Sequence, residues 1–260
     1  MSQGAAVLLG AIAGATVFLG LPVARMRGLP KGMQGFLNAF ATGILVFLLW
    51  DILSHAGGPV EAALKQGSHN SFVAMAAIFA IGIAAGLLGL VYFNRTLFGR
   101  LKHGTTTPSP QSVSLAIATG LGLHNLSEGL AIGESAHIGA IAFTGVLAVG
   151  FALHNVTEGF GIAAPMTTGP KPASWKFLGL AGLIGGGPTF LGTWIGYLAS
   201  SSYLSVAFLA VAAGALLYVL NELFNLGRRL SSPPVFAWGL LLGFLTAFAT
   251  DLFLTAASGA

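Results

Sequence analysis

The chain contains no cysteine, and charged residues make up only 7% of its 260 positions. Without cysteine, neither a disulfide nor a thiolate metal site can form. A soluble domain has about 25% charged residues, so this chain has too few charges to cover a water-facing surface. It is 55% hydrophobic, and its mean hydropathy is +0.86. The composition therefore predicts a protein that lies largely in lipid.

Long apolar runs, by contrast, are abundant. A helix needs about 20 apolar residues to cross the hydrocarbon core of a membrane. Eight stretches qualify, at about 5–24, 32–53, 71–93, 112–133, 138–164, 174–199, 203–226 and 234–257. Segments rich in Gly, Pro, Ser and Thr separate them, as in "TTGPKP" at 167–172. We expect an all-α membrane protein in which residues 1–260 form one domain of eight transmembrane helices.

The basic residues predict the orientation of these helices. The loops after the first, third, fifth and seventh runs hold every Lys and Arg except Lys65: Arg25, Arg27, Lys31, Arg95, Arg100, Lys102, Lys171, Lys176, Arg228 and Arg229. Short basic loops are retained in the cytoplasm. We therefore expect both termini on the extracytoplasmic side of a multi-pass cell (inner) membrane protein. The same distribution explains the pI of about 9.7 without a nucleic-acid partner.

The seven acidic residues are few enough to consider one by one. Glu61 and Glu134 fall in predicted outside loops. Asp51 and Asp251 lie near predicted span ends, where a charge costs far less than at the membrane centre, so a structural role explains them. The other three lie in the predicted spans, and an ionisable residue at that depth marks a pathway or a site.

One polar motif occurs twice, as "LHNLSEG" at 123–129 and "LHNVTEG" at 153–159. In each copy His and Glu are four residues apart, so they share one face of a helix. The two copies lie at similar depth on consecutive, antiparallel spans. Imidazole, carboxamide and carboxylate groups converging twice would make a cage for a divalent metal, and this set suits Zn, Fe, Ni or Mn better than Ca or Mg.

Each motif ends in glycine, Gly129 or Gly159. A glycine here would loosen the helix and expose a carbonyl, or it would allow close helix packing; the sequence leaves both readings open. The match between 121–133 and 151–163 also predicts a pseudo-two-fold axis in the membrane plane, as in carriers built from inverted repeats.

At these motifs the chain resembles the ZIP family of divalent metal ion transporters, as a bacterial-type member. "HNLSEG" at 124–129 and "HNVTEG" at 154–159 are similar to the family's motifs on its fourth and fifth spans. "EGFGIAAPMTTGPK" from 158, "LGTWIGYL" at 191–198 and "AGALLYVLNEL" at 213–223 extend the resemblance over most of the chain after 112.

The resemblance implies a 3+2+3 inverted-repeat bundle that carries a metal ion, Zn or Fe before Mn, Co, Ni or Cd, toward the cytoplasm. It implies that one helix group slides against another in an elevator-like way. The metal ligands that it implies are His124, Asn125, Glu128, His154, Asn155 and Glu158. Asn221 and Glu222 would lie toward the cytoplasmic exit.

Three departures from the family pattern bear on the site. Ser127 and Thr157 stand where the family usually has Pro before the Glu, although a hydroxyl can also bond the backbone. Gly187 precedes Pro188 where a Glu is typical, and Leu45 occupies the place of a Met found in some bacterial relatives. These losses favour a single-ion site made of nitrogen and oxygen ligands.

Two other functions explain these residues less well. A membrane-embedded metal-dependent hydrolase would need a water-activating acid beside an open three-ligand site, and no H-E-x-x-H or G-x-S-x-G motif occurs. A haem protein with axial His124 and His154 would leave the Asn and Glu residues unexplained. We expect no enzyme activity and no cofactor; the partners are the divalent ion and the lipid bilayer, with a homodimer as one option. Four further histidines, His55, His69, His103 and His137, are read as loop residues.

Overall fold

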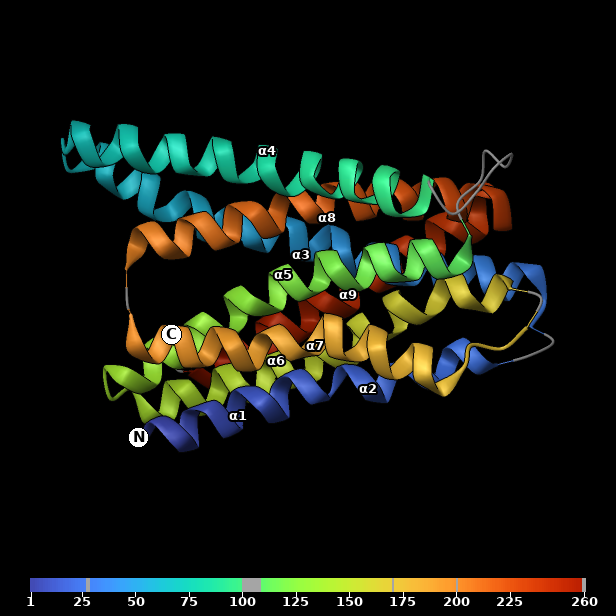
Figure 1. Cartoon of the computed structure of the whole chain (residues 1–260), viewed down its shortest axis with the longest axis horizontal. Coiled ribbons are helices and arrows are strands. Elements are labelled where there is room, and N and C mark those ends of the chain that lie inside the picture. The colour runs from blue at the N-terminus through green and yellow to red at the C-terminus, as the bar shows by residue number, and fades with distance from the viewer. Residues whose placement is uncertain (27–28, 100–108, 170, 200, 259–260) are drawn as a thin grey trace.

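The computed structural model describes residues 1–26, 29–99, 109–169, 171–199 and 201–258, and within them it contains helices and no strand (Figure 1). The helices are α1 Gln3–Ala15, α2 Val17–Gly20, η1 Leu21–Arg25, α3 Lys31–Lys65, α4 His69–Gly99, α5 Pro110–His137, α6 Ile141–Ala163, η2 Ala164–Thr168, α7 Trp175–Leu198, α8 Ser202–Leu230 and α9 Pro233–Ser258. The prediction of an all-α membrane protein is confirmed. Arg27, Arg100, Lys102 and His103 lie outside the described residues.

Seven helical segments of the described chain are long and apolar enough to cross a membrane: Gln3–Arg25, Lys31–Lys65, His69–Tyr92, Ile141–Thr168, Trp175–Leu198, Ser202–Leu230 and Pro233–Leu252. The predicted span at 112–133 is the 28-residue helix α5, which is more polar because it carries Ser, Thr, His, Asn and Glu side chains. Most of α5 is buried, and it packs against α1, α6, α7 and α8. The other helices therefore separate α5 from lipid.

Two predicted boundaries were wrong. Helix α3 continues to Lys65 and α5 to His137, so Glu61 and Glu134 are helical rather than in loops. Pro59 lies within α3, and the sequence after it is rich in helix-forming residues. The Lys65 ammonium also lies 3.5 Å from the Glu61 carboxylate one turn earlier.

The first predicted span is interrupted rather than continuous. Helix α1 ends at Ala15 and α2 begins at Val17. At the junction the Thr16 hydroxyl lies 2.7 Å from the Ala13 carbonyl and 2.6 Å from the Ala152 carbonyl of α6. The interruption is thus anchored to α6.

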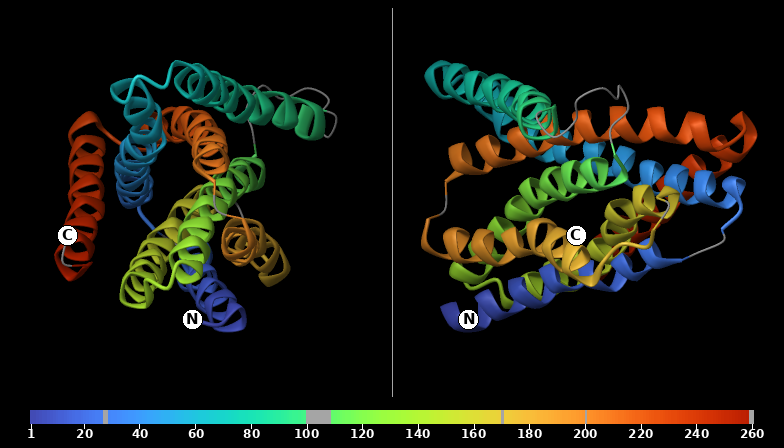
Figure 2. Two further views of the ribbon diagram at one scale, coloured as in Figure 1. Left: turned by 90° about the vertical axis from the view of Figure 1, so that its left-hand side faces the viewer. Right: turned by 45° about the vertical axis from the view of Figure 1, so that its right-hand side comes forward.

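The helices form two groups, which are visible end-on in Figure 2. The first helix group contains α1, α2, α5, α6 and α7, and the second contains α3, α4, α8 and α9. The most extensive packing lies inside the groups, between α5 and α7, α3 and α9, α4 and α8, and α3 and α8.

Among the described residues, the closest glycine contacts between helix backbones lie inside these groups. Added to Gly129 or Gly159, a Cβ would collide with the backbone of α7 or α2, respectively, and Gly43 and Gly86 meet α9 and α8 in the same way. Among the described glycines, none has a Cβ position that would collide with the backbone of the other group. A Cβ at Gly120 of α5 would collide with the Val219 side chain of α8 and lie 3.6 Å from the Ala215 carbonyl, an ordinary contact distance. Of the two readings of the motif glycines, the structure supports close helix packing.

The packing also shows the pairing that an inverted repeat requires. In such a repeat the first, second and third spans correspond to the sixth, seventh and eighth. The packing of α4 on α8 then corresponds to the packing of α9 on α3. In the same way, the packing of α5 on α7 corresponds to the packing of α6 on α1 and α2. This pattern agrees with the predicted 3+2+3 arrangement around α5 and α6.

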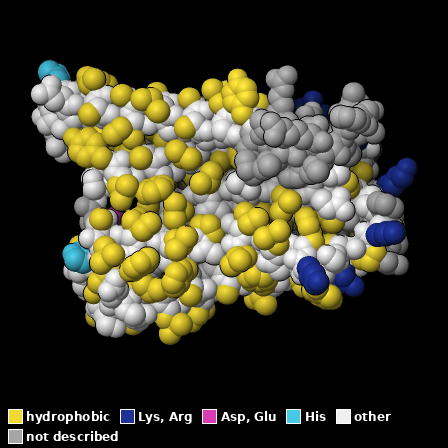
Figure 3. Space-filling view, in the orientation of Figure 1, with side chains coloured by type: hydrophobic (Ala, Val, Ile, Leu, Met, Phe, Trp, Pro, Cys, Tyr) yellow, Lys and Arg dark blue, Asp and Glu magenta, His cyan; other side chains and the backbone are white. Residues whose placement is uncertain are grey.

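The basic side chains lie at the ends of the bundle. In Figure 3 the visible Lys and Arg side chains gather at one end, two histidines mark the other, and hydrophobic side chains cover the surface between them. At the basic end the Arg25 guanidinium lies 4.7 Å from the centre of the Trp175 ring and donates a hydrogen bond to the Ala173 carbonyl. An amphipathic pair of this kind suits a membrane interface.

The absence of native cysteine makes the orientation directly testable. We expect a Ser68→Cys variant to react with a membrane-impermeant maleimide in intact cells, because Ser68 lies between α3 and α4 at the end predicted to be outside. A Lys171→Cys variant should react only after permeabilisation. Labelling in the reverse order would invert the predicted orientation.

Candidate metal site

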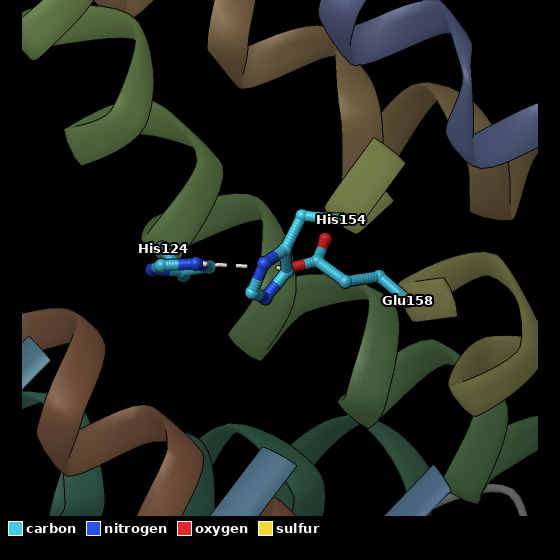
Figure 4. Close-up of side chains that lie close together, drawn as sticks. All are labelled: His124, His154 and Glu158. Carbon is cyan, nitrogen blue, oxygen red and sulfur yellow. Dashed lines mark ion pairs between the residues drawn. The ribbon is translucent and has the colours of Figure 1, made fainter. Parts of the chain in front are cut away.

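Helices α5 and α6 bring three side chains of the repeated motifs together (Figure 4). His124, His154 and Glu158 each offer one potential ligand atom, and these atoms all lie within 4.8 Å of one another. The His124 Nε2 atom is 3.6 Å from Glu158 Oε1, and the two imidazole ring centres are 6.4 Å apart. These three residues, called here the His–Glu cluster, have a separation that one metal ion could bridge, since Zn–N and Zn–O bonds are about 2.0–2.2 Å long.

Glu128 lies beside this cluster. Its Oε1 atom is 3.2 Å from His124 Nε2, as the four-residue spacing on one helix face predicts. It does not belong to the set of atoms within 4.8 Å of one another. The structure therefore brings three of the six predicted ligands into one cluster and a fourth to its edge.

The two asparagines have different partners. The Asn125 amide donates one hydrogen bond to Glu158 Oε2, at 2.8 Å, and another to the Gly185 carbonyl of α7, at 3.0 Å. The Asn155 amide donates to the Ala13 carbonyl of α1, at 3.0 Å. Both side chains are fully buried. Asn125 is therefore attached to the cluster, whereas Asn155 holds α6 to the end of α1.

Hydroxyl groups form matching backbone hydrogen bonds in the two motifs. Ser127 donates a hydrogen bond to the His124 carbonyl, and Thr157 donates one to the His154 carbonyl, both at 2.6 Å. Such bonds back to the preceding turn compete with the helical hydrogen bonds and bend helices slightly. The two motifs therefore share the same local hydrogen bond one turn before the Glu.

Several buried polar atoms at the site have no hydrogen-bond partner among the described residues. They are His124 Nδ1 and Nε2, His154 Nε2, Glu128 Oε2, Glu158 Oε1, Asn125 Oδ1 and Asn155 Oδ1. A buried polar atom without a partner costs about 1–3 kcal/mol. This concentration of unsatisfied nitrogen and oxygen atoms favours a ligand that accepts electron pairs, as a cation does.

A cavity of about 550 Å³ leads to the cluster. His124, Glu128 and His154 line its inner part, and Asp51, His55, Glu134 and Asp251 also contribute to its wall. Its other lining residues come from the segments 47–52, 127–151 and 205–209. These parts of α3, α5, α6 and α8 all lie in the half of the bundle nearest to the α3–α4 turn, so the cavity belongs to the end predicted to be outside.

The opposite half is packed. Leu121 lies one turn before the first motif's Asn125, and Ile162 one turn after Glu158. Both belong to a buried hydrophobic cluster that also contains Leu45, Ile117 and Leu216. The approach to the site from the basic end is therefore blocked by close-packed side chains.

The remaining predicted residues lie away from the cluster. Asn221 is exposed and Glu222 is half-buried on α8, in the half of the bundle that carries Arg228 and Arg229. A Cβ atom at Gly187 would meet only Leu183 of its own helix, whereas Gly185 faces Ile162 and Val17. A carboxylate at position 187 would thus point away from α5 and α6 here.

Four of the cavity residues were predicted at span ends or in loops: Asp51, His55, Glu134 and Asp251. His55 was predicted in a loop, but it is helical and lies 3.3 Å from Asp51 Oδ1. The signal was present in the sequence: Asp51 and His55 have the same four-residue spacing as the motif His and Glu. The predicted span at 32–53 ended between Asp51 and His55 and so left them in different segments.

In comparisons with known proteins, no family model matches the chain, and no curated protein matches it.

The cluster predicts a specific loss of metal affinity. We expect His154→Ala to weaken Zn(II) binding by at least about 100-fold, because removing a ligand should exceed the 10- to 100-fold effect of removing a ligand's supporting hydrogen bond. Isothermal titration calorimetry of the protein in detergent measures this. His137→Ala is the matched control, since His137 is exposed and contacts the Tyr197 ring instead. Equal losses in both variants would contradict the assignment.

Proposed function

We propose that this chain is a carrier that moves a divalent transition metal ion, Zn(II) or Fe(II), toward the cytoplasm. The observation that carries the proposal is the His–Glu cluster at the inner end of the outer cavity. Two imidazoles and a carboxylate, with a second carboxylate adjacent, suit Zn, Fe, Ni or Mn more than Ca or Mg. Ionisable groups are rare inside membrane bundles except on ion or proton pathways.

The charge of the outer cavity supports a cationic cargo. Four of its lining residues are acidic, namely Asp51, Glu128, Glu134 and Asp251, and the lining residues include no Lys or Arg. The chain has only seven acidic residues in all, so more than half of them line this one cavity. A cleft of one charge sign with apolar walls raises the local concentration of the opposite ion.

The packing supports movement between two groups of helices. The cluster belongs to the first helix group, while Asp51, His55 and Asp251 belong to the second. Inside each group, glycines allow the closest approach of helix backbones. At the boundary α5 packs on α8, where Gly120 meets the Val219 side chain first and the Ala215 carbonyl at ordinary contact distance. Since access from the basic end is closed, delivery to that side requires the cluster to move relative to the second group. An elevator-like sliding of the first group would accomplish this.

The finer assignments extend the same proposal. In line with the ZIP resemblance, a single ion is held by the His–Glu cluster with Glu128 beside it, and Asn221 and Glu222 act on the exit side. We place the protein in the inner cell membrane with both termini outside, and a homodimer is one option for its assembly.

Transport itself is tested in proteoliposomes. We expect uptake of Zn(II) or Fe(II) by the wild-type protein, measured across a panel with Mn, Co, Ni and Cd, with and without a proton gradient. Glu158→Ala and Glu128→Ala should reduce uptake to the level of empty vesicles while the protein remains folded in the membrane. Normal uptake by Glu158→Ala would refute the assignment of the cluster as the transport site.

The acidic cavity wall predicts a different kinetic effect. We expect Asp51→Asn combined with Asp251→Asn to raise the KM for uptake by about tenfold at low ionic strength, at the lower end of known steering effects, with little change in maximal rate. The effect should shrink in high salt, because exposed charges are screened. Glu61→Gln is the matched control, since Glu61 is exposed on α3 beside Lys65 and does not line the cavity. A salt-independent loss of maximal rate would contradict electrostatic collection.

A further inference from the structure

The carboxylate of Glu158 is held by one oxygen only. Its Oε2 atom accepts a hydrogen bond from the Asn125 amide at 2.8 Å, while Oε1 has no hydrogen-bond partner among the described residues and lies 3.6 Å from His124 Nε2. The two oxygens therefore have separate tasks: one is tied to the protein and the other faces the cluster.

Asn125 is itself held in place by α7. Its amide nitrogen also donates to the Gly185 carbonyl, at 3.0 Å, so both amide hydrogens have acceptors. Gly122 allows the α5 backbone to approach the Ile184 carbonyl of α7, and Gly185 has no side chain at this contact. These glycines thus bring the α7 backbone within reach of the Asn125 amide.

We propose that Asn125 acts as a positioning residue that restricts Glu158 to one-oxygen coordination and thereby favours small tetrahedral ions over larger ones. This inference rests on the proposed metal-binding function of the same cluster. A carboxylate bound through one oxygen suits the four-coordinate geometry of Zn(II). A carboxylate free to use both oxygens supplies the higher oxygen count that Mn(II) prefers.

The repeated motif supplies a matched comparison. Asn155 occupies the same place in the second motif and is buried equally, but its amide donates to the Ala13 carbonyl and to no carboxylate. Replacing either asparagine with the isosteric leucine removes one buried amide. Only the replacement at position 125 frees a carboxylate.

The test is the ratio of Zn(II) to Mn(II) affinity, measured by calorimetry on the full chain in detergent. Asn125→Leu should weaken Zn(II) binding by about 10- to 100-fold, the usual effect of removing a group that orients a ligand. Mn(II) affinity should change less, so the ratio falls. Asn155→Leu should lower thermal stability and leave the ratio at the wild-type value. An unchanged ratio in Asn125→Leu, or equal shifts in both variants, would overturn the inference.

A second measurement needs no variant to fold. X-ray absorption of the Zn(II)-loaded wild-type protein should show carboxylate coordination through single oxygens, and two-oxygen coordination by Glu158 in a metal-loaded structure would refute the inference. Failure of the wild-type protein to bind any metal would instead refute the proposed function. The two failures are therefore distinguishable.

Discussion

Keeping ionisable side chains away from lipid is the constraint on which this structure depends. Helix α5 carries His124, Asn125 and Glu128 in a chain with few other polar groups, and a lipid-facing position for it would be costly. The bundle solves this by surrounding α5 with α1, α6, α7 and α8. Once α5 is central, the second motif on α6 can reach it, and the polar atoms of both helices face a shared interior rather than hydrocarbon.

Glycine allows the helices that enclose α5 to pack closely against it. Where α5 meets α7, Gly129 and Gly192 each face the partner helix's backbone, and Gly159 does the same between α6 and α2. Membrane helices gain little from the hydrophobic effect and depend on such close packing. The same contacts that seal the polar helix also define a rigid unit. Enclosure of α5 and the tight packing of α5 on α7 therefore have one cause, the glycines at their contact.

Most of the fold could be predicted from the sequence, since apolar length and the positions of Lys and Arg are properties of single residues summed over a window. The pairing of His124 with His154 and Glu158 followed from spacing and antiparallel succession. What could not be predicted depends on three-dimensional neighbours. The different partners of Asn125 and Asn155 arise from α7 and α1, which are distant in sequence, and the identical motif letters conceal that difference. The helical continuation through Gly57, Gly58 and Pro59 was hidden for the opposite reason, because local breakers suggested an end that the helix does not have.

The length of α3 has a consequence for the shape of the outer surface. Thirty-five residues make a helix about 52 Å long, well beyond the roughly 30 Å of hydrocarbon that it crosses. The hairpin of α3 and α4 projects past the neighbouring helices in Figure 1, and the predicted orientation puts this end outside. Asp51 and His55 lie on α3 where it lines the cavity. Under the proposed function, α3 would provide a continuous protein wall from bulk water to the His–Glu cluster.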